Sequence, residues 1–168
     1  LIPRIAIEFV LAHVPGARDP LPAPSPWYAL MDASGGAGTH ALFEDALGAA
    51  LQEGLVQDAA IAANEAQAEA LWRLRENISE AQKREGASIK HDISVPVGAT
   101  AQFIARAVPA VLAALPGARP VIFGHLGDGN LHFNFSAPKD GDKAAFLARW
   151  EEIQAIVHGI VHEFSGSI

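Results

Sequence analysis

The sequence predicts an α+β fold, a ferredoxin-like sandwich in which helices pack on one face of an antiparallel sheet. Two observations predict this class. Segments with apolar residues at helical spacing alternate with short aromatic or β-branched segments. Asp128 and Gly129 also lie between two of the short segments, as the turn of a β-hairpin does. No glycine-rich nucleotide-binding loop follows any expected strand.

The first half of the chain is divided by glycine and proline. Four prolines between residues 17 and 26 predict a loop, since proline continues neither a helix nor a central strand. Around this loop, the spacing of apolar residues separates helices from strands. The expected elements are a helix over 5–11, a strand over 27–32, a helix over 42–51 and a second strand over 56–63.

The second half alternates helix and strand more regularly. A helix over 103–115 carries Pro109, which is expected to bend it. In a strand over 88–95, the odd-numbered residues face the core, His91 among them, and the even-numbered residues face the other way. The remaining expected elements are a helix over 66–81 that stops near Gly86, strands over 119–123 and 130–136, and a helix over 143–164.

The chain has 168 residues, half of them hydrophobic, which is enough for one real core. We expect residues 1–26 to form an edge helix and linker, and residues 27–168 to form the domain itself. The chain starts at Leu1 without Met or a signal pattern, and it stops at Ile168 just after an apparently continuing helix. We therefore expect a fragment that is truncated at its C-terminus.

Composition argues against several classes of function. The formal net charge is −7 and the 12 Lys and Arg residues are dispersed, so nucleic acid is a poor partner. No apolar run approaches the roughly 18 residues of a membrane span. The absence of cysteine removes disulfides, thiolate metal sites and cysteine nucleophiles. It is also compatible with the reducing cytoplasm, where we expect the protein to act.

The hairpin places two of the seven histidines as a pair. If Asp128 and Gly129 form a two-residue type I′ turn, His125 lies opposite His132 with Cβ atoms about 4.5–5.5 Å apart. Asn134 falls on the same face, and the other face is apolar. Two imidazoles in register suit Zn²⁺ or another first-row divalent ion, although a carboxylate from elsewhere must complete the site. The alternative is two histidines that oppose each other without binding a metal.

A basic surface is expected beside this face. Arg75 and Ser79 are four residues apart in one helix, and Lys90 begins the strand that follows. Together they could hold a carboxylate, with Arg as a bidentate fork and Lys as a point charge. The competing interpretation is that Arg75 is solvated or pairs with Glu76 or Glu80.

Three segments together resemble one protein family. They are Trp72 to Glu76, Ile89 to Pro96 (Ile-Lys-His-Asp-Ile-Ser-Val-Pro), and Gly124 to His132 (Gly-His-Leu-Gly-Asp-Gly-Asn-Leu-His). From about Trp27 onward, the sequence resembles the C-terminal, substrate-binding domain of FAD-linked oxidases and dehydrogenases of the D-lactate, glycolate and D-2-hydroxyglutarate group. That domain has a ferredoxin-like fold, which agrees with the element order expected here.

The resemblance implies a role for each candidate residue. His125 and His132 would be metal ligands, and Asn134 would contact metal or substrate. Arg75, Ser79 and Lys90 would hold a carboxylate of the substrate. In the family, the chain runs on past Ile168 into a Ser-Ala-Glu-His-Gly segment, whose Glu completes the metal site and whose His acts as base. No catalytic residue is therefore expected within residues 1–168, and the residues that bind the cofactor are not identified.

The resemblance also implies cofactors and partners. FAD would be bound mainly by an N-terminal domain of the same polypeptide, and the divalent metal would be Zn, Mn or Fe. The substrate would be a D-2-hydroxy acid, which is oxidised to the 2-oxo acid by removal of a proton and transfer of a hydride to the flavin. The isolated fragment is expected to be inactive. A homodimer is compatible with the sequence.

Two other functions fit the same sequence. The chain could be a stand-alone ferredoxin-like module that binds a metal or a small ligand without catalysis. It could also be a purely structural or oligomerising domain, but that function leaves the face with His125, His132 and Asn134 unexplained.

Overall fold

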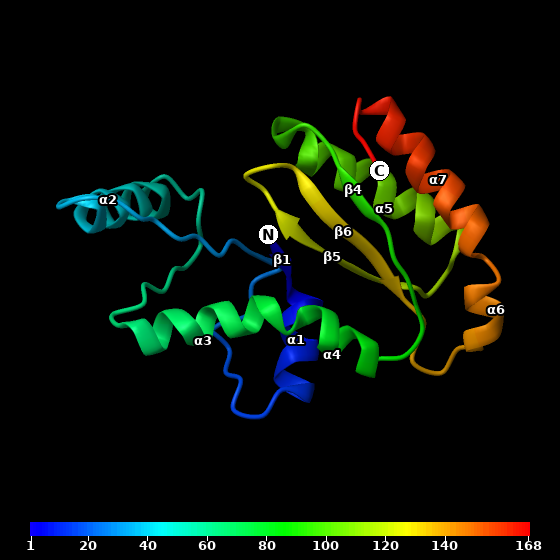
Figure 1. The fold of residues 1–168 in the computed structure, drawn as a ribbon, viewed down its shortest axis with the longest axis horizontal. Coiled ribbons are helices and arrows are strands. Elements are labelled where there is room, and N and C mark those ends of the chain that lie inside the picture. The colour runs from blue at the N-terminus through cyan, green and yellow to red at the C-terminus, as the bar shows by residue number, and fades with distance from the viewer.

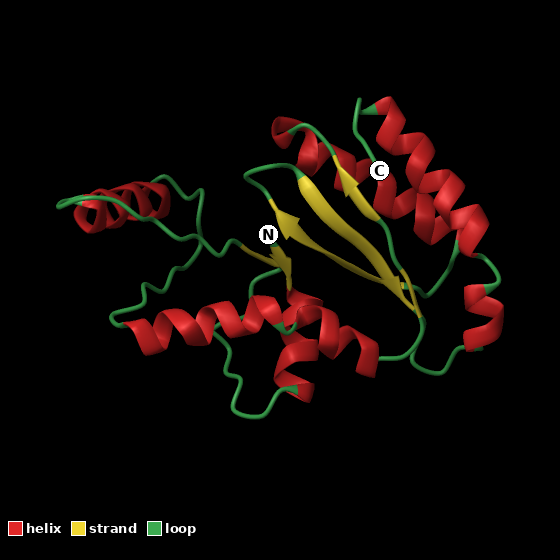
Figure 2. Cartoon of the chain, viewed as in Figure 1, coloured by secondary structure: helices red, strands yellow, loops and turns green.

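An antiparallel sheet forms the centre of the structure, a computed structural model that describes residues 1–168 (Figure 2). Strand β6 (Asn130–Ser136) pairs with β5 (Arg119–His125) on one side. On its other side it pairs with β3 (Ser88–Ile89) and β4 (Asp92–Ser94), which follow each other along the edge. The α+β class with an antiparallel sheet is thus confirmed.

The connections between these strands are those of a ferredoxin-like sandwich. After β4, the chain passes through a short 3₁₀ turn (Val97–Ala99) and α5 (Thr100–Ala114), then the β5–β6 hairpin and α7 (Trp150–Glu163). Ser167 then forms an antiparallel bridge with Ser94. The order is strand, helix, strand, strand, helix, strand, with the last strand reduced to one bridge at the free edge of β4.

The larger core lies between the sheet and the helix pair α5 and α7 (Figure 1). Phe103 from α5, Phe133 from β6 and Val157 from α7 are fully buried in it. The odd-numbered residues of the strand over 88–95 point into this core as predicted, and His91 is among the buried ones. The apolar alternation of these strands is therefore set by one packed face.

Helices also cover the other face of the sheet, rather than one face alone. Here α1 (Arg4–His13), α3 (Glu65–Glu76) and α4 (Ile78–Arg84) lie below the sheet in Figure 1. Val121 and Phe123 of β5 are fully buried against apolar side chains of these helices. Strand β5 carries apolar residues on both faces because helices cover both faces of the sheet there.

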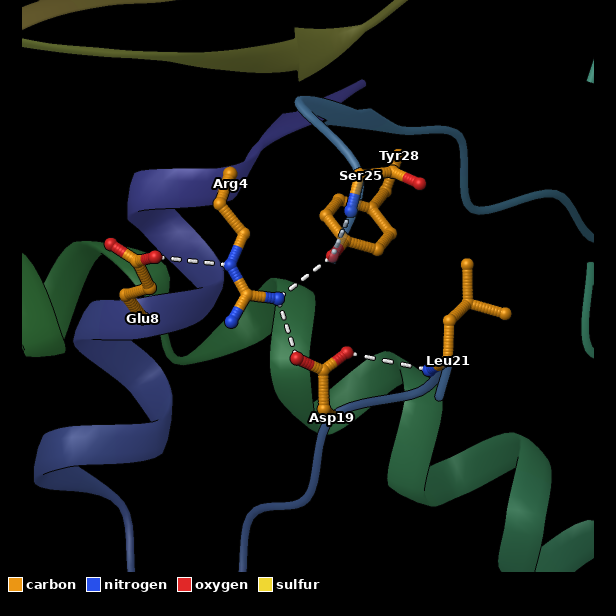
Figure 3. A network of polar contacts seen from close by, with 6 residues as sticks. All are labelled: Arg4, Glu8, Asp19, Leu21, Ser25 and Tyr28. Atoms are coloured by element: carbon orange, nitrogen blue, oxygen red, sulfur yellow. Dashed lines mark hydrogen bonds and ion pairs between the residues drawn. The ribbon is translucent and has the colours of Figure 1, made fainter. Parts of the chain in front are cut away.

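The proline-rich segment is held against α1 by one arginine (Figure 3). Arg4 donates from Nη1 to Asp19 Oδ2 at 2.5 Å and to Tyr28 Oη at 2.8 Å, and from Nε to Glu8 Oε1 at 3.1 Å. Tyr28 belongs to β2 (Trp27–Tyr28), which pairs with β1 (Ile2–Pro3). The strand predicted over 27–32 is therefore present, but it is only two residues long.

The segment after β2 extends away from the body of the molecule (Figure 1). It contains α2 (Thr39–Gln52), which matches the predicted helix but buries none of its side chains. The predicted strand over 56–63 is wrong, because these residues form an irregular connection to α3. Asp58 and several alanines weaken the local preference for a strand, and no neighbouring strand offers a ladder of hydrogen bonds.

Three of the predicted long elements are interrupted. The helix over 66–81 becomes α3 and α4, which meet at Asn77, and the last helix becomes α6 (Lys143–Leu147) and α7. The strand over 88–95 is split into β3 and β4. Asn77 itself keeps helical backbone angles, so residues spaced by four or seven along α3 and α4 still share a face.

One stretch is, by length and composition alone, apolar enough to span a membrane. It is Val97–Ala114, which comprises the 3₁₀ turn and α5, so the prediction that no run approaches this length is wrong. One face of α5 is buried between the sheet and α7, with Phe103, Ala107 and Val111 completely covered. One face of α5 thus packs against the folded domain, and the rest of its surface is left partly or fully exposed.

Candidate functional site

The hairpin loop is longer than predicted. Among its residues only Gly129 has a positive φ, +75°, whereas a type I′ turn requires positive φ at both central positions. The loop therefore spans Leu126 to Gly129. The N–H of Asn130 donates to Asp128 Oδ1 at 2.9 Å, so the aspartate side chain closes the turn that its backbone was expected to make.

This loop shifts the register of the two strands by two residues. His125 lies opposite Asn130, and His132 lies opposite Phe123, so the predicted His125–His132 pairing is wrong. The two histidines still occupy the same face, because a shift by an even number preserves it. As diagonal neighbours, their backbones are about 7–8 Å apart.

Arg75 of α3 lies against this face of the sheet, which α1, α3 and α4 cover. Its Nη2 donates to His125 Nε2 at 3.2 Å, and its guanidinium carbon lies 4.9 Å from the centre of the Phe123 ring. Arg75 forms no ion pair with an acidic side chain, and Glu80 pairs with Lys83 instead. Burial lowers the pKa of Arg75, and the charge of Glu76 opposes this shift. An arginine that is partly desolvated without a carboxylate partner is a candidate anion-binding group.

His132 is held by a carboxylate from the neighbouring strand. Asp92 lies opposite it across β4 and β6, and Asp92 Oδ1 contacts His132 Nδ1 directly. The ring of His132 also lies beside that of Phe123, with centroids 4.7 Å apart. Because the Nδ1–H of a neutral His132 donates to this carboxylate, its Nε2 is left as the free ligand atom.

Lys90 and Asn134 are also neighbours on this face. Ser88 pairs with Ser136, and Asp92 pairs with His132 in the same register, which places Lys90 opposite Asn134. Lys90 is exposed, whereas Asn134 is almost completely buried. The segment between β3 and β4 thus places the positive charge of Lys90 next to the amide of Asn134.

Ser79 and Gln82 continue the helical face that Arg75 begins, at spacings of four and seven. Ser79 is exposed and its hydroxyl makes no hydrogen bond within the chain. Gln82, which the sequence analysis did not consider, is fully buried and bonded to Asn134. Its position seven residues after Arg75 is the sequence signal that could have identified it.

The two histidines of this face do not make a metal site by themselves. His132 offers a free Nε2, but the Nε2 of His125 accepts from Arg75, so a metal there would displace this contact. No three His, Asp or Glu side chains in the chain lie close enough together to hold a metal ion. Because zinc sites in proteins have at least three protein ligands, the two imidazoles fit a metal only if another residue joins them.

A cleft lies elsewhere in the molecule, between α3 and the segment that carries α2. It has a volume of about 920 Å³ and is lined mainly by apolar side chains, including Tyr28, Phe43 and Trp72. None of Arg75, His125, His132 and Asn134 lines it. The polar groups that could bind and orient a small acid therefore converge on the sheet face, and not in this cleft.

Comparison with known proteins shows which proteins the chain is similar to. The chain is 37% identical over 164 residues to a D-2-hydroxyglutarate dehydrogenase of Xanthomonas citri pv. viticola, and the match covers 97% of this chain and 34% of the relative. It is 36% identical over 174 residues to a D-2-hydroxyglutarate dehydrogenase of Stutzerimonas stutzeri, covering 97% of this chain and 37% of the relative. The mitochondrial D-2-hydroxyglutarate dehydrogenase of Arabidopsis thaliana is 37% identical over 167 residues, and the match covers 97% of this chain and 28% of the relative.

The chain thus spans about a third of the length of these curated relatives. Over its whole length, residues 1–168, it matches the description "FAD linked oxidases, C-terminal domain". The resemblance inferred from the motifs around Arg75, Lys90 and His125 is therefore confirmed. The chain belongs to the family of FAD-linked oxidase C-terminal domains.

Proposed function

We propose that this chain is the substrate-binding part of an FAD-dependent dehydrogenase that oxidises a D-2-hydroxy acid to the 2-oxo acid. One observation carries the proposal. Arg75, His125 and His132 meet on a single face of the sheet, next to Asn134 and Lys90. Cations, imidazoles and an amide on one surface are the groups that position a hydroxy acid for reaction.

D-2-hydroxyglutarate is the substrate that we propose within this class. The relatives are named for it, and it carries a carboxylate at each end. The face offers two cationic side chains, Arg75 from α3 and Lys90 from the sheet edge. We assign Arg75, Lys90 and the free hydroxyl of Ser79 to a carboxylate of the substrate, and Asn134 to its reacting end.

We propose His125 and His132 as ligands of a divalent metal, Zn, Mn or Fe, with a third ligand from outside residues 1–168. A metal bound there would act as a Lewis acid on the hydroxyl and carboxylate oxygens of the substrate. Asp92 would keep His132 in the tautomer that presents Nε2. We expect FAD, held mainly by another domain of the same polypeptide, to accept the hydride, and the base to lie outside this chain.

Steady-state kinetics of the full-length protein test the proposal. We expect oxidation of D-2-hydroxyglutarate at a kcat/KM well above that for D-lactate or glycolate, together with a divalent metal in elemental analysis. Residues 1–168 alone, supplied with FAD, are expected not to turn over. Equal rates with all three acids contradict the dicarboxylate assignment, and no oxidation of any D-2-hydroxy acid contradicts the function itself.

Three further expectations stay predictions. A cytoplasmic location is one, and the plant relative is named as mitochondrial. A homodimer is another, and light scattering of the full-length protein measures it. The division of the chain at residue 26 is the third, although α1 contributes Ile7 and Val10 to the core on the lower face of the sheet.

A further inference from the structure

Three polar side chains form a buried chain of hydrogen bonds beneath the candidate site. Asn134 Nδ2 donates to Gln82 Oε1 at 3.1 Å, and Gln82 Nε2 donates to Ser136 Oγ at 3.1 Å. Gln82 and Ser136 are fully buried, and Asn134 is 4% exposed. Burying polar groups costs free energy unless each is hydrogen-bonded, so these two hydrogen bonds fix all three side chains in place.

The direction of these bonds determines how Asn134 faces the site. Its Nδ2 is engaged by Gln82, whereas its Oδ1 accepts no hydrogen bond from the protein. Only two fully buried side-chain polar atoms lack a partner, His91 Nε2 and Thr100 Oγ1. Asn134 Oδ1 is not one of them, so it is accessible on the face that carries Lys90 and His132.

We infer that Gln82 is a positioning residue that turns the amide oxygen of Asn134 toward the substrate. An amide oxygen that faces the site accepts a hydrogen bond, and it cannot donate one to a carboxylate. Asn134 therefore contacts the α-hydroxyl of the substrate, the one donor that a 2-hydroxy acid offers. This inference rests on the proposed function for the identity of the substrate, but not for the orientation of the amide.

A double-mutant cycle in the full-length protein tests the kinetic part. The variants are Gln82→Leu, Asn134→Ala and the two combined, with D-2-hydroxyglutarate as substrate. We expect Gln82→Leu to lower kcat/KM about threefold to tenfold and Asn134→Ala to lower it at least about tenfold. The double variant should be no worse than Asn134→Ala alone, because Gln82 acts through Asn134. Thr100→Val, which removes a buried hydroxyl on the opposite face of the sheet, is the matched control and should keep the wild-type kinetics.

Inhibition by glutarate, which has both carboxylates but no hydroxyl, tests the assigned contact. Its inhibition constant should be unchanged in Asn134→Ala and Gln82→Leu. Equal weakening of glutarate and of the hydroxy acid means that Asn134 donates to a carboxylate, which overturns the inference. Additive effects in the double-mutant cycle, or wild-type kinetics of Gln82→Leu, overturn it as well.

The orientation has a readout that needs no activity. In NMR spectra of the protein, the side-chain NH₂ of Asn134 should exchange slowly with solvent, and Gln82→Leu or Gln82→Met should make this exchange fast. Gln82→Met gives the same test if the leucine variant folds poorly. Slow exchange in both variants overturns the inference. If the wild-type protein shows slow exchange but oxidises no hydroxy acid, only the proposed function has failed.

Discussion

Arg75 Nη2 lies 3.2 Å from His125 Nε2, so a helix below the sheet meets the end of the hairpin strand at the candidate site. The same guanidinium lies over Phe123, which fixes its direction. Arg75→Lys should lower kcat/KM for D-2-hydroxyglutarate by about tenfold to a hundredfold in the full-length protein, since a point charge replaces a planar fork.

The matched control for this change is Arg73→Lys, an exposed position in the same helix. It should leave the kinetics of D-2-hydroxyglutarate unchanged. D-lactate, which lacks the distal carboxylate, should lose much less with Arg75→Lys than the dicarboxylate does. A loss of equal size for both acids would place Arg75 at the α-carboxylate instead.

Asp92→Asn should weaken metal binding by about tenfold to a hundredfold, because His132 loses the carboxylate that orients its ring. Metal affinity of the full-length protein, measured by titration calorimetry with Zn²⁺, is the readout. His132→Ala should lose the metal altogether, whereas Asp140→Asn, in an exposed loop, should bind as the wild type does. If Asp92→Asn keeps wild-type affinity while His132→Ala loses it, the ring of His132 needs no carboxylate.

Gly129→Ala should destabilise the protein strongly. Gly129 has a φ of +75°, and an added Cβ would lie 2.0 Å from the carbonyl oxygen of Val95. The left-handed backbone alone costs about 1–2 kcal/mol, and the contact with Val95 adds to it, so the midpoint of thermal unfolding should fall by several degrees. Gly127→Ala, in the same loop with open space around its Cβ, should change the midpoint little. Equal midpoints for both variants would contradict the described packing of the loop.

The ion pair of Glu85 should make the free energy of unfolding depend on pH. Burial alone would raise the pKa of Glu85, but hydrogen bonds from Arg119 and His13 outweigh it, and the net pKa is lowered. The stabilisation is therefore complete above the pKa of an unfolded glutamate, about 4.3, and is lost as the pH falls through the lower pKa of the folded state.

Urea unfolding at several pH values measures this dependence. At pH 7, Glu85→Gln should be less stable than the wild type by about 1–3 kcal/mol, and the difference should shrink toward pH 3. Glu53→Gln, at an exposed position, is the control and should follow the wild type at every pH. A constant difference between Glu85→Gln and the wild type over this range would mean that the ionisation of Glu85 contributes nothing.

The sequence predicts which face of the sheet a residue occupies better than it predicts which residue lies opposite on the neighbouring strand. The alternation along β6 assigns His132 and Asn134 to one face whatever partner they have, because side chains alternate with a period of two. The partner of His132 depends on the loop, and there the local Asp-Gly signal was misleading. A side-chain bond from Asp128 to the backbone of Asn130 replaced the expected two-residue turn.

The contacts that complete the site are non-local and were not predicted. The contact between Asp92 and His132 joins residues 40 positions apart, and that between Gln82 and Asn134 joins residues 52 apart. No local periodicity encodes such distances, although helical spacing placed Gln82 on the face of Arg75. The strand predicted over 56–63 failed for a related reason, because a strand exists only where another strand pairs with it.

Helix α2 buries none of its side chains, and this has a consequence for local stability. A helix of 14 residues with no fully buried side chain gains little from tertiary packing, and on its own it is only marginally stable in water. Its amide protons should therefore exchange with deuterium almost as fast as those of an unfolded peptide, while those of β6 should exchange only through global unfolding. If another surface of the full-length protein covers the apolar side chains of α2, the amide protons of Thr39–Gln52 should exchange slowly instead.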